Sequence, residues 1–220
     1  MSVLSFDIGI KNLSYCLLDK SNNNIVDWGI INISCDQLCQ HINTKNKCCD
    51  KSATYSHGDT LLCSSHSKLK QYPNKCKKIK SVNSVYNVGK KLVEELDKYP
   101  EFLECSDVIV ENQPSLKNPT MKSIQMIVYS YFIIKGVCRE DCSIKNVEMI
   151  NARNKLKVYK GEPIVCDIKE TYKRNKYLAI QYCGKMIIDE EKKFIDLYDN
   201  SKKKDDLSDS YLQGIYYLNK

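Results

Sequence analysis

Short apolar segments separated by polar turns make up the first 33 residues. Residues 3–9 form a run of strand-forming side chains that ends in an aspartate and a glycine, and further apolar runs follow at 13–19 and 25–33. Asn22-Asn23-Asn24, between the last two runs, is a turn signal. This pattern predicts three antiparallel strands joined by short turns.

Helical and strand patterns alternate after residue 80. The predicted elements there are a helix at 82–99, a strand at 107–111, a helix at 119–137, a strand at 144–150, a basic helical segment at 153–185 interrupted near Gly161 and Pro163, a polar linker at 199–204 and a last helix at 204–218. Pro100 ends the first of these helices. Antiparallel strands, followed by strands that alternate with helices, predict an α/β fold with a mixed sheet.

The predicted helix at 119–137 is apolar on nearly every face between residues 124 and 134. A helix that covers only one side of a sheet needs a single apolar stripe. We therefore expect this helix to be buried either within the fold or in an interface between two subunits.

Residues 34–80 lack apolar periodicity, and Cys, His, Lys and Asn dominate there. Lysines gather at the end of the segment, at Lys68, Lys70, Lys75, Lys77, Lys78 and Lys80. We predict a Cys/His-rich insertion at 34–80 within a single domain spanning 1–220. Its basic end suggests contact with an arm of DNA, and a solvated surface is the equally simple interpretation.

Composition narrows the class of protein. The chain has 34 Lys and Arg against 27 Asp and Glu, a net charge of +7 that is compatible with nucleic-acid binding. Lysines far outnumber arginines, which favours phosphate contacts over bidentate reading of bases. No apolar stretch is long enough to span a bilayer, and no signal peptide is visible, so we expect an intracellular protein without a membrane partner.

Four carboxylates stand where the predicted elements would bring them together. Asp7 and Glu111 end two core-like strands, and Asp206 and Asp209 share one face of the last helix because they are three residues apart. Four neighbouring acids repel one another, and one or two divalent cations would relieve that repulsion. For Asp205 and Asp206 alone, complementation of the helix dipole is the simpler explanation, but it does not account for Asp209.

The order of these segments resembles the Holliday junction resolvases of the RuvC-like group within the RNase H-like fold, closest to the poxvirus-type enzymes of large DNA viruses. The resemblance rests on Phe6-Asp7-Ile8-Gly9-Ile10-Lys11-Asn12, Val110-Glu111-Asn112-Gln113-Pro114 and Lys204-Asp205-Asp206-Leu207-Ser208-Asp209-Ser210. It covers about 1–33 and 82–220.

This resemblance implies a Mg²⁺- or Mn²⁺-dependent endonuclease that cuts four-way DNA junctions as a homodimer. It implies that Asp7, Glu111, Asp206 and Asp209 hold the metal. It also implies a lysine near the scissile phosphate, for which Lys155 and Lys157 are the candidates. If the chain is viral, the place of action would be the site of viral DNA replication in the host cell.

Two alternatives remain open, and a third is disfavoured. The chain could be a related nuclease that cuts flaps or RNA–DNA hybrids, or a zinc-stabilised DNA-binding protein without turnover. Asp-x-Gly on a first strand also opens actin- and hexokinase-like ATPases. Those proteins need two such domains and further phosphate-binding loops, which 220 residues with only eight glycines do not supply.

Zinc is the metal expected in the insertion. Cys63-Ser64-Ser65-His66 places a Cys and a His three residues apart, downstream of several cysteines. Zinc takes four tetrahedral nitrogen and sulfur ligands. The preferred set is Cys39, Cys49, Cys63 and His66, and Cys35, Cys48 or Cys76 could replace a member. A segment with few apolar residues cannot build a core of its own, so a metal is a sensible source of its order.

Overall fold

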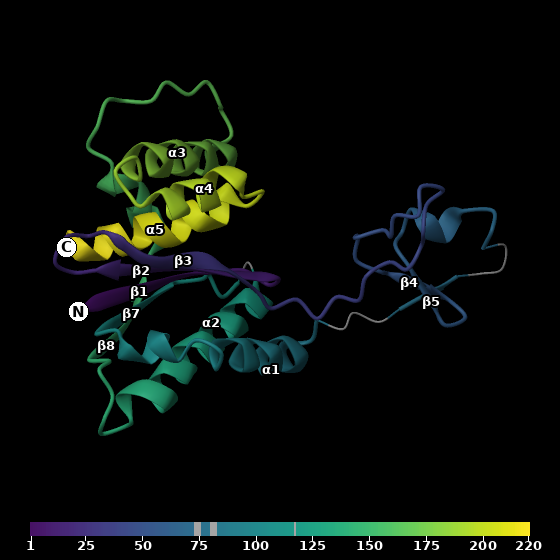
Figure 1. The fold of residues 1–220 in the computed structure, drawn as a ribbon, viewed down its shortest axis with the longest axis horizontal. Helices are drawn as coiled ribbons and strands as arrows, with labels where there is room; N and C mark the ends of the chain where they lie inside the picture. The colour runs from purple at the N-terminus through teal and green to yellow at the C-terminus, as the bar shows by residue number, and fades with distance from the viewer. Residues whose placement is uncertain (73–75, 80–82, 117) are drawn as a thin grey trace. The chain divides into compact units, whose positions relative to one another are not determined.

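The structure, a computed structural model, describes residues 1–72, 76–79, 83–116 and 118–220. The chain divides into two compact units, which we describe separately (Figure 1). The core unit consists of residues 1–33 and 92–220, and the module consists of residues 34–91. Helix α1 (Val85–Leu96) crosses the boundary between the two ranges.

A five-stranded sheet in the order β3-β2-β1-β7-β8 organises the core unit. Its strands are β1 (Ser2–Ile8), β2 (Asn12–Asp19), β3 (Ile25–Asn32), β7 (Asp107–Glu111) and β8 (Asn146–Ile150). The first three strands are antiparallel, whereas β7 pairs parallel with both β1 and β8. The predicted mixed sheet, with antiparallel strands first and parallel strands afterwards, is therefore confirmed.

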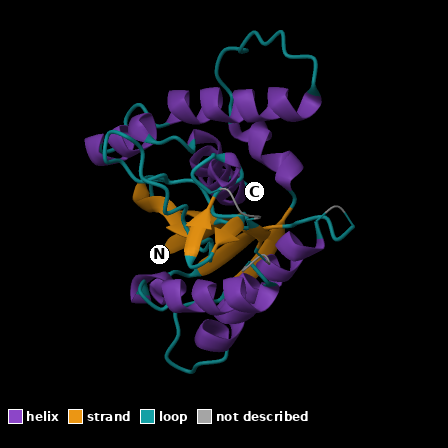
Figure 2. Cartoon of the chain, turned by 90° about the vertical axis from the view of Figure 1, so that its right-hand side faces the viewer, coloured by secondary structure: helices purple, strands orange, loops and turns teal. Residues whose placement is uncertain are grey.

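Helices cover both faces of this sheet (Figures 1 and 2). Helix α5 (Lys204–Leu218) packs on β1 and β2, with α3 (Thr171–Met186) and α4 (Lys192–Asn200) on the same side. Helix α2 (Pro119–Phe132) packs on β7 and β1 from the opposite face. Both sides of the central strands are consequently buried, which explains why their sequences are nearly continuous apolar runs.

Two contacts hold α5 closely on the sheet. A Cβ atom at Gly214 would lie 2.5 Å from Cδ1 of Leu18, so the helix reaches this depth only without a side chain there. The indole nitrogen of Trp28 on β3 donates to the carbonyl of Leu207 at 3.2 Å, and its ring lies 5.8 Å, centroid to centroid, from that of Tyr211 on α5. The contacts of Trp28 fix the first turns of α5, which carry Asp205, Asp206 and Asp209.

The helical segments differ in detail from the prediction. The helix expected at 119–137 is α2 followed by one π-helical turn, Ile133–Val137. The segment expected to be helical at 153–185 is a 3-10 helix, Ala152–Val158, then irregular chain, then α3. Helix α4 was not predicted, because its nine residues are too few to show a persistent helical period. Its last two residues overlap the start of the predicted linker. Val82, the first residue of another predicted helix, lies outside the described residues.

The module contains a small antiparallel sheet in the order β5-β4-β6. Its strands are β4 (Tyr55–His57), β5 (Thr60–Leu62) and β6 (Lys77–Lys78). Gly58 adopts a φ of +57° in the turn between β4 and β5, a conformation that glycine tolerates readily. Strands of two or three residues leave almost no alternating pattern, so the sequence did not reveal them.

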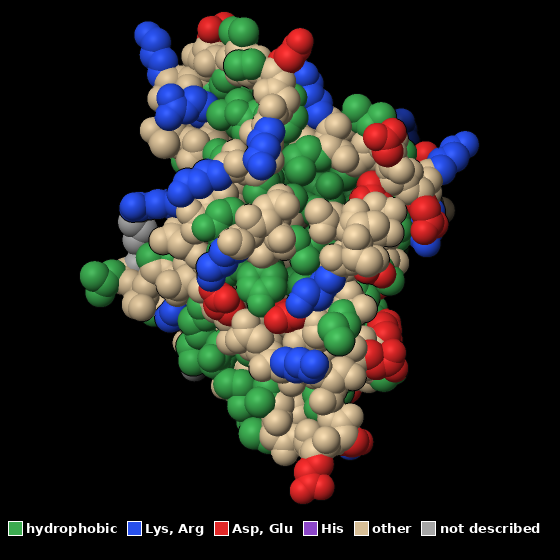
Figure 3. Space-filling view, turned by 90° about the vertical axis from the view of Figure 1, so that its left-hand side faces the viewer, with side chains coloured by type: hydrophobic (Ala, Val, Ile, Leu, Met, Phe, Trp, Pro, Cys, Tyr) green, Lys and Arg blue, Asp and Glu red, His purple; other side chains and the backbone are tan. Residues whose placement is uncertain are grey.

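Charged side chains are unevenly distributed on the surface. On the face drawn in Figure 3, basic side chains lie mostly in the upper half and acidic ones mostly along the right edge and at the bottom, with apolar patches between them.

None of the helices in the described ranges combines the length and the apolar character needed to cross a membrane.

Candidate functional site

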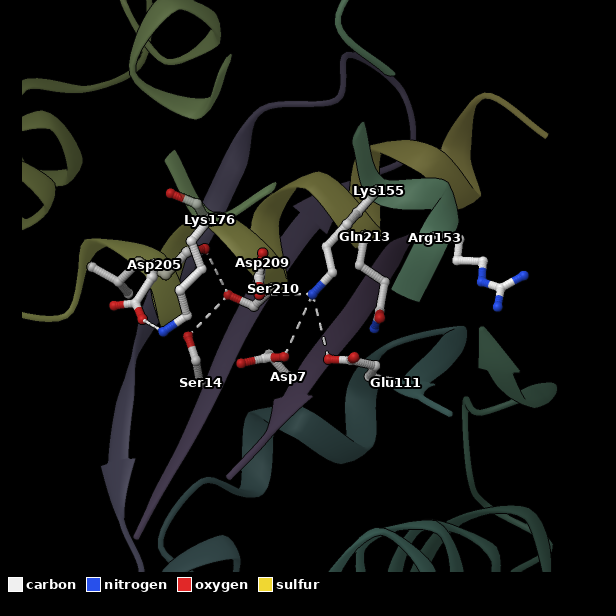
Figure 4. Close-up of polar contacts among 12 residues, drawn as sticks. Asp7, Ser14, Glu111, Arg153, Lys155, Lys176, Asp205, Asp209, Ser210 and Gln213 are labelled. Atoms are coloured by element: carbon white, nitrogen blue, oxygen red, sulfur yellow. Dashed lines mark hydrogen bonds and ion pairs between the residues drawn. The ribbon is translucent and has the colours of Figure 1, made fainter. Parts of the chain in front are cut away.

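The predicted carboxylates meet at one edge of the central sheet. Strands β1 and β7 run parallel, with Phe6 opposite Val110, so their carboxyl ends lie side by side. Side chains alternate along a strand, which places Asp7 on the same face as Ser5, the residue that packs against α5 at Gly214. Glu111 ends β7 on the same face. Asp209 faces both of them from the second turn of α5 (Figure 4).

Lys155 occupies the centre of this group. It lies on the 3-10 helix that directly follows β8, and its side chain is only 11% exposed. Its ammonium nitrogen is 2.8 Å from Oδ2 of Asp209, 3.4 Å from Oε2 of Glu111 and 3.8 Å from Oδ1 of Asp7 (Figure 4). One buried cation therefore contacts carboxylates from three separate elements.

Burial and mutual repulsion shift the pKa values of these groups. Burial raises the pKa of Asp209 to about 6, with Lys155 lowering it and the charge of Asp7 raising it. Burial and the adjacent Glu111 raise the pKa of Asp7 well above its ordinary value, against the influence of Lys155. Burial alone would lower the pKa of Lys155, but the carboxylates of Asp7, Asp209 and Glu111 raise it above that of an ordinary lysine. The site thus holds more negative charge than its one ammonium balances.

The two remaining aspartates of α5 have different surroundings. The charge of Asp206 contributes to the raised pKa of Asp7, and its Oδ2 atom is 3.7 Å from the ammonium of Lys203. Asp205 pairs instead with Lys176 of α3, and its side chain is only 18% exposed (Figure 4). This ion pair with the neighbouring helix turns Asp205 away from the other carboxylates.

The structure separates the two candidate lysines. Lys155 points into the carboxylates, whereas Lys157 is exposed and donates to Oδ1 of Asn154 at 2.9 Å. Arg153, from the same short helix, also lies away from the carboxylates (Figure 4). Side chains two residues apart point to different sides of so short a helix, so only one of the two lysines enters the site.

Buried polar side chains behind the carboxylates support them, and the sequence interpretation did not identify these residues. The amide of Gln213 donates to the carbonyl of Phe6 at 3.1 Å and to the hydroxyl of Ser5 at 3.2 Å, which ties α5 to the strand that carries Asp7. The hydroxyls of Ser14 and Ser210 lie 3.0 Å apart between β2 and α5. Gln213 follows Asp206 and Asp209 at helical spacing, and this repeat was the available signal.

The donor set fits a hard divalent cation. Asp7, Glu111, Asp206 and Asp209 offer carboxylate oxygens, the ligands that Mg²⁺ and Mn²⁺ prefer. Lys155 already shows that three of the four converge on one positive charge. Cys or His ligands, which would favour softer metals, are not among these contacts.

A second cluster of possible metal ligands lies in the module. Cys39, Cys49, Cys63 and His66 each offer one atom, and these atoms all lie within 4.8 Å of one another. They are the four residues of the preferred zinc set. Cys39 and Cys49 lie on two chain segments joined by backbone hydrogen bonds, from Cys39 to Lys51 and from Cys49 to His41. Cys63 follows β5, and His66 begins the next 3-10 helix.

The surroundings of this cluster suit a thiolate-bound metal. Burial opposes ionisation of Cys63, but the backbone N–H groups of His66 and Ser65 lower the pKa of its thiol below the ordinary value. Nδ1 of His66 is 3.3 Å from Sγ of Cys39, and the ring of His41 packs on that of His66 with centroids 3.9 Å apart. Three sulfurs and one nitrogen at this spacing match the tetrahedral ligand set of structural zinc.

Comparison with known proteins finds a viral relative of the chain. It matches no protein-family model. It is 30% identical to the uncharacterized protein L451 of Acanthamoeba polyphaga mimivirus, over 99% of this chain and 74% of that protein.

Two solved structures resemble the chain in fold. The fowlpox virus resolvase, solved with its substrate Holliday junction DNA, matches with a TM-score of 0.53 and 16% identity, over 100% of this chain and 97% of that one. The yeast mitochondrial Holliday junction resolvase Ydc2 matches with a TM-score of 0.51 and 16% identity, over 98% of this chain and 78% of that one. The predicted RuvC-like fold is thereby confirmed.

Proposed function

This chain belongs to one family with the mimivirus protein L451 and has the resolvase fold, and we propose that it is a Mg²⁺-dependent endonuclease that resolves four-way DNA junctions. The observation that carries this proposal is the convergence of Asp7, Glu111 and Asp209 on the single ammonium of Lys155. A buried group of acids is costly to maintain, and a structural role alone does not explain why three elements contribute to it.

The residues of the site have distinct proposed roles. Asp7, Glu111, Asp206 and Asp209 would hold the metal, which when bound activates a water molecule and stabilises the leaving oxygen of the phosphodiester. Lys155 balances the carboxylates in the free protein and, once the metal displaces it, would be available to contact a phosphate oxygen of the bound strand. Asp205 and Lys176 stabilise the start of α5 as an ion pair and do not touch the reacting atoms.

We also propose that the enzyme acts as a homodimer, as a four-way junction needs two symmetric cuts. The exposed apolar side chains Met126, Ile134 and Val137, on α2 and the π-helical turn after it, support this proposal. Met126 and Ile134 are two helical turns apart and Val137 follows three residues later, so these exposed side chains lie along one side of the helix. Sedimentation at micromolar concentration should show a dimer with or without junction DNA, and a monomer under both conditions would refute it.

Zinc in the module is the second part of the proposal. Cys39, Cys49, Cys63 and His66 would hold one zinc ion and so order the segment around β4 and β5.

On this proposal residues 1–220 form one resolvase domain, and the segment at 34–80 is an insertion within it. Because the relative L451 is viral, the site of viral DNA replication in the host cell is the proposed place of action.

A substrate panel tests the proposed reaction and its alternatives. Purified protein is incubated with Mg²⁺ and a four-way junction, a flap, a linear duplex or an RNA–DNA hybrid. We expect paired cuts in the junction and little cleavage of the duplex. Preferred cleavage of the flap or hybrid would support a related nuclease instead. Metal-independent binding without any cleavage would support a zinc-stabilised DNA-binding protein.

A further inference from the structure

The positive charge of the chain is concentrated in the module. Residues 34–91 contain 11 lysines, no arginine, three aspartates and no glutamate, which gives a formal charge of +8. The whole chain carries +7, so the core unit carries −1. Zinc bound by three thiolates and one neutral imidazole would lower the charge of the module by only one. The core unit, which holds the carboxylate site, therefore has no net attraction for a polyanion.

Seven described lysines of the module, all outside α1, have exposed side chains. They are Lys45, Lys47, Lys51, Lys68, Lys70, Lys77 and Lys78. Within the described part of the chain, none of these seven forms an ion pair with a carboxylate. In the core unit, by contrast, lysines such as Lys20, Lys98 and Lys220 pair with Asp107, Glu95 and Glu148.

Two groups of these lysines belong to ordered parts of the module. Lys68 lies on the 3-10 helix that His66 begins, and Lys77 and Lys78 form β6, the edge strand of the small sheet. Lys45 and Lys47 flank a turn in which the side chain of Asn43 accepts from both of their backbone N–H groups. Backbone hydrogen bonds from Asn43 to Lys47 and from Cys49 to His41 connect the turn at Lys45 to the Cys/His cluster, and Lys68 follows His66 on one short helix. A folded cluster therefore fixes where both groups are displayed.

We propose that the module is the phosphate-binding arm of this protein, which grips the backbone of duplex DNA next to the branch point without reading its sequence. Exposed lysines act as point charges toward phosphate, and the module has no arginine for bidentate base contacts. This inference rests on the proposed nuclease function for its choice of DNA as the ligand. The binding itself does not require the carboxylate site to be active.

The test compares two full-length variants that lose the same charge. In the first, Lys68, Lys70, Lys77 and Lys78 are changed to Gln. In the control, Lys98, Lys135, Arg139 and Lys145 are changed to Gln; these are exposed residues of the core unit near the beginnings of β7 and β8, away from the carboxylates. Binding of a four-way junction and of a plain duplex is measured in Ca²⁺ at several salt concentrations, and zinc content confirms that the module is folded.

We expect the module variant to bind both DNAs at least about tenfold more weakly, and the slope of log Kd against log salt to fall by about three to four. The control should change both quantities much less. A second variant, Lys45, Lys47 and Lys51 to Gln, tests the other lysine group, and a loss of affinity in either module variant supports the proposal. Unchanged DNA affinity in both module variants would overturn it.

The outcomes separate this inference from the proposed function. If the module variants bind DNA normally while wild-type protein cuts junctions, the inference fails and the nuclease function stands. If wild-type protein cuts no DNA but loses affinity when the module lysines are removed, the nuclease function fails and the inference stands.

Discussion

The ammonium of Lys155 lies 2.8 Å from Oδ2 of Asp209, and from that one position it also contacts Glu111 and Asp7. The lysine therefore occupies the place where a divalent cation would meet the same carboxylates. Two positive charges cannot share this space without strong repulsion, so metal binding has to be accompanied by movement of Lys155. A displaced ammonium beside the carboxylates would be available to a phosphate oxygen of the DNA.

Replacing Lys155 with Met should make the folded protein depend on metal. The change leaves three buried carboxylates without their shared cation, and we expect the free energy of unfolding to fall by about 3 kcal/mol without metal. Mg²⁺ should raise the free energy of unfolding of the variant by more than it raises that of the wild type, because a ligand that binds the folded state stabilises it. Thermal unfolding with and without Mg²⁺ measures both effects.

Lys157→Met is the matched control for this measurement. Lys157 is exposed on the same 3-10 helix and contacts no carboxylate of the site, so its replacement should change stability by less than about 0.5 kcal/mol. If the two variants unfold alike, and respond alike to Mg²⁺, the assignment of Lys155 as the internal cation of the site is wrong.

Zinc analysis tests the cluster in the module. Protein freed of loosely bound metal should contain about one zinc per chain, because four ligand atoms already lie together. Cys63→Ser should lose the zinc and also the slow hydrogen exchange of the segment around β4 and β5. Cys138→Ser, at an exposed cysteine of the core unit, should keep both. Wild-type protein without zinc, but with the module still protected from exchange, would refute the site.

The contribution of Asp107 to folding stability should depend on pH. This residue begins β7, at the end of the sheet opposite the carboxylate site. Burial opposes ionisation of this carboxyl, but hydrogen bonds from Lys20, Ser106 and Tyr217 lower its pKa below the ordinary value. A lowered pKa in the folded state adds stability that is present above the unfolded pKa and is lost as the pH falls through the folded value.

Asp107→Asn should therefore cost about 1–2 kcal/mol at pH 7. The difference between variant and wild type should shrink as the pH falls from 4 toward 3, since the wild-type carboxyl then becomes protonated as well. Urea unfolding at pH 7 and pH 3 gives the two differences. If the difference in free energy of unfolding between variant and wild type is the same at both pH values, the ionised form of Asp107 does not contribute to stability.

The sequence predicted the parts of the fold that have a strong period or a clear end. Three antiparallel strands, two later strands and the helix at Lys204–Leu218 were all predicted with nearly correct bounds. Their apolar runs are long, and polar or glycine-containing turns separate them. Helix α4 and strands β4 to β6 were missed, because elements of two to nine residues in a polar context leave no distinct period.

The site was partly visible in the sequence for a related reason. Asp7 and Glu111 end apolar runs, and Asp206 and Asp209 show helical spacing, so residue order alone brings them together. The position of Lys155 depends on a 3-10 helix after β8, and the pairing of Asp205 depends on how α3 packs beside α5. Tertiary packing decides both, and spacing along the chain does not encode it.

The three aspartates of α5 should differ in their importance for cleavage. Asp205→Asn removes a partly exposed ion pair with Lys176, worth at most about 1 kcal/mol, and should keep most of the cleavage activity. Asp206→Asn and Asp209→Asn each remove a proposed metal ligand with little change in volume. Cleavage of a four-way junction should fall by orders of magnitude in both. If Asp205→Asn abolishes cleavage while Asp206→Asn leaves it intact, the roles assigned to these two residues must be exchanged.

Junction cleavage by Asp7→Asn tests the central claim most directly, because Asp7 lies on the first strand, contacts the internal cation and borders Glu111. Wild-type protein and the variant are compared in Mg²⁺ for cleavage and in Ca²⁺ for binding. We predict that cleavage falls by orders of magnitude while junction binding is kept or tightens, since one repulsive charge near the phosphates is gone. An Asp7→Asn protein that cuts junctions at the wild-type rate would contradict the proposed site.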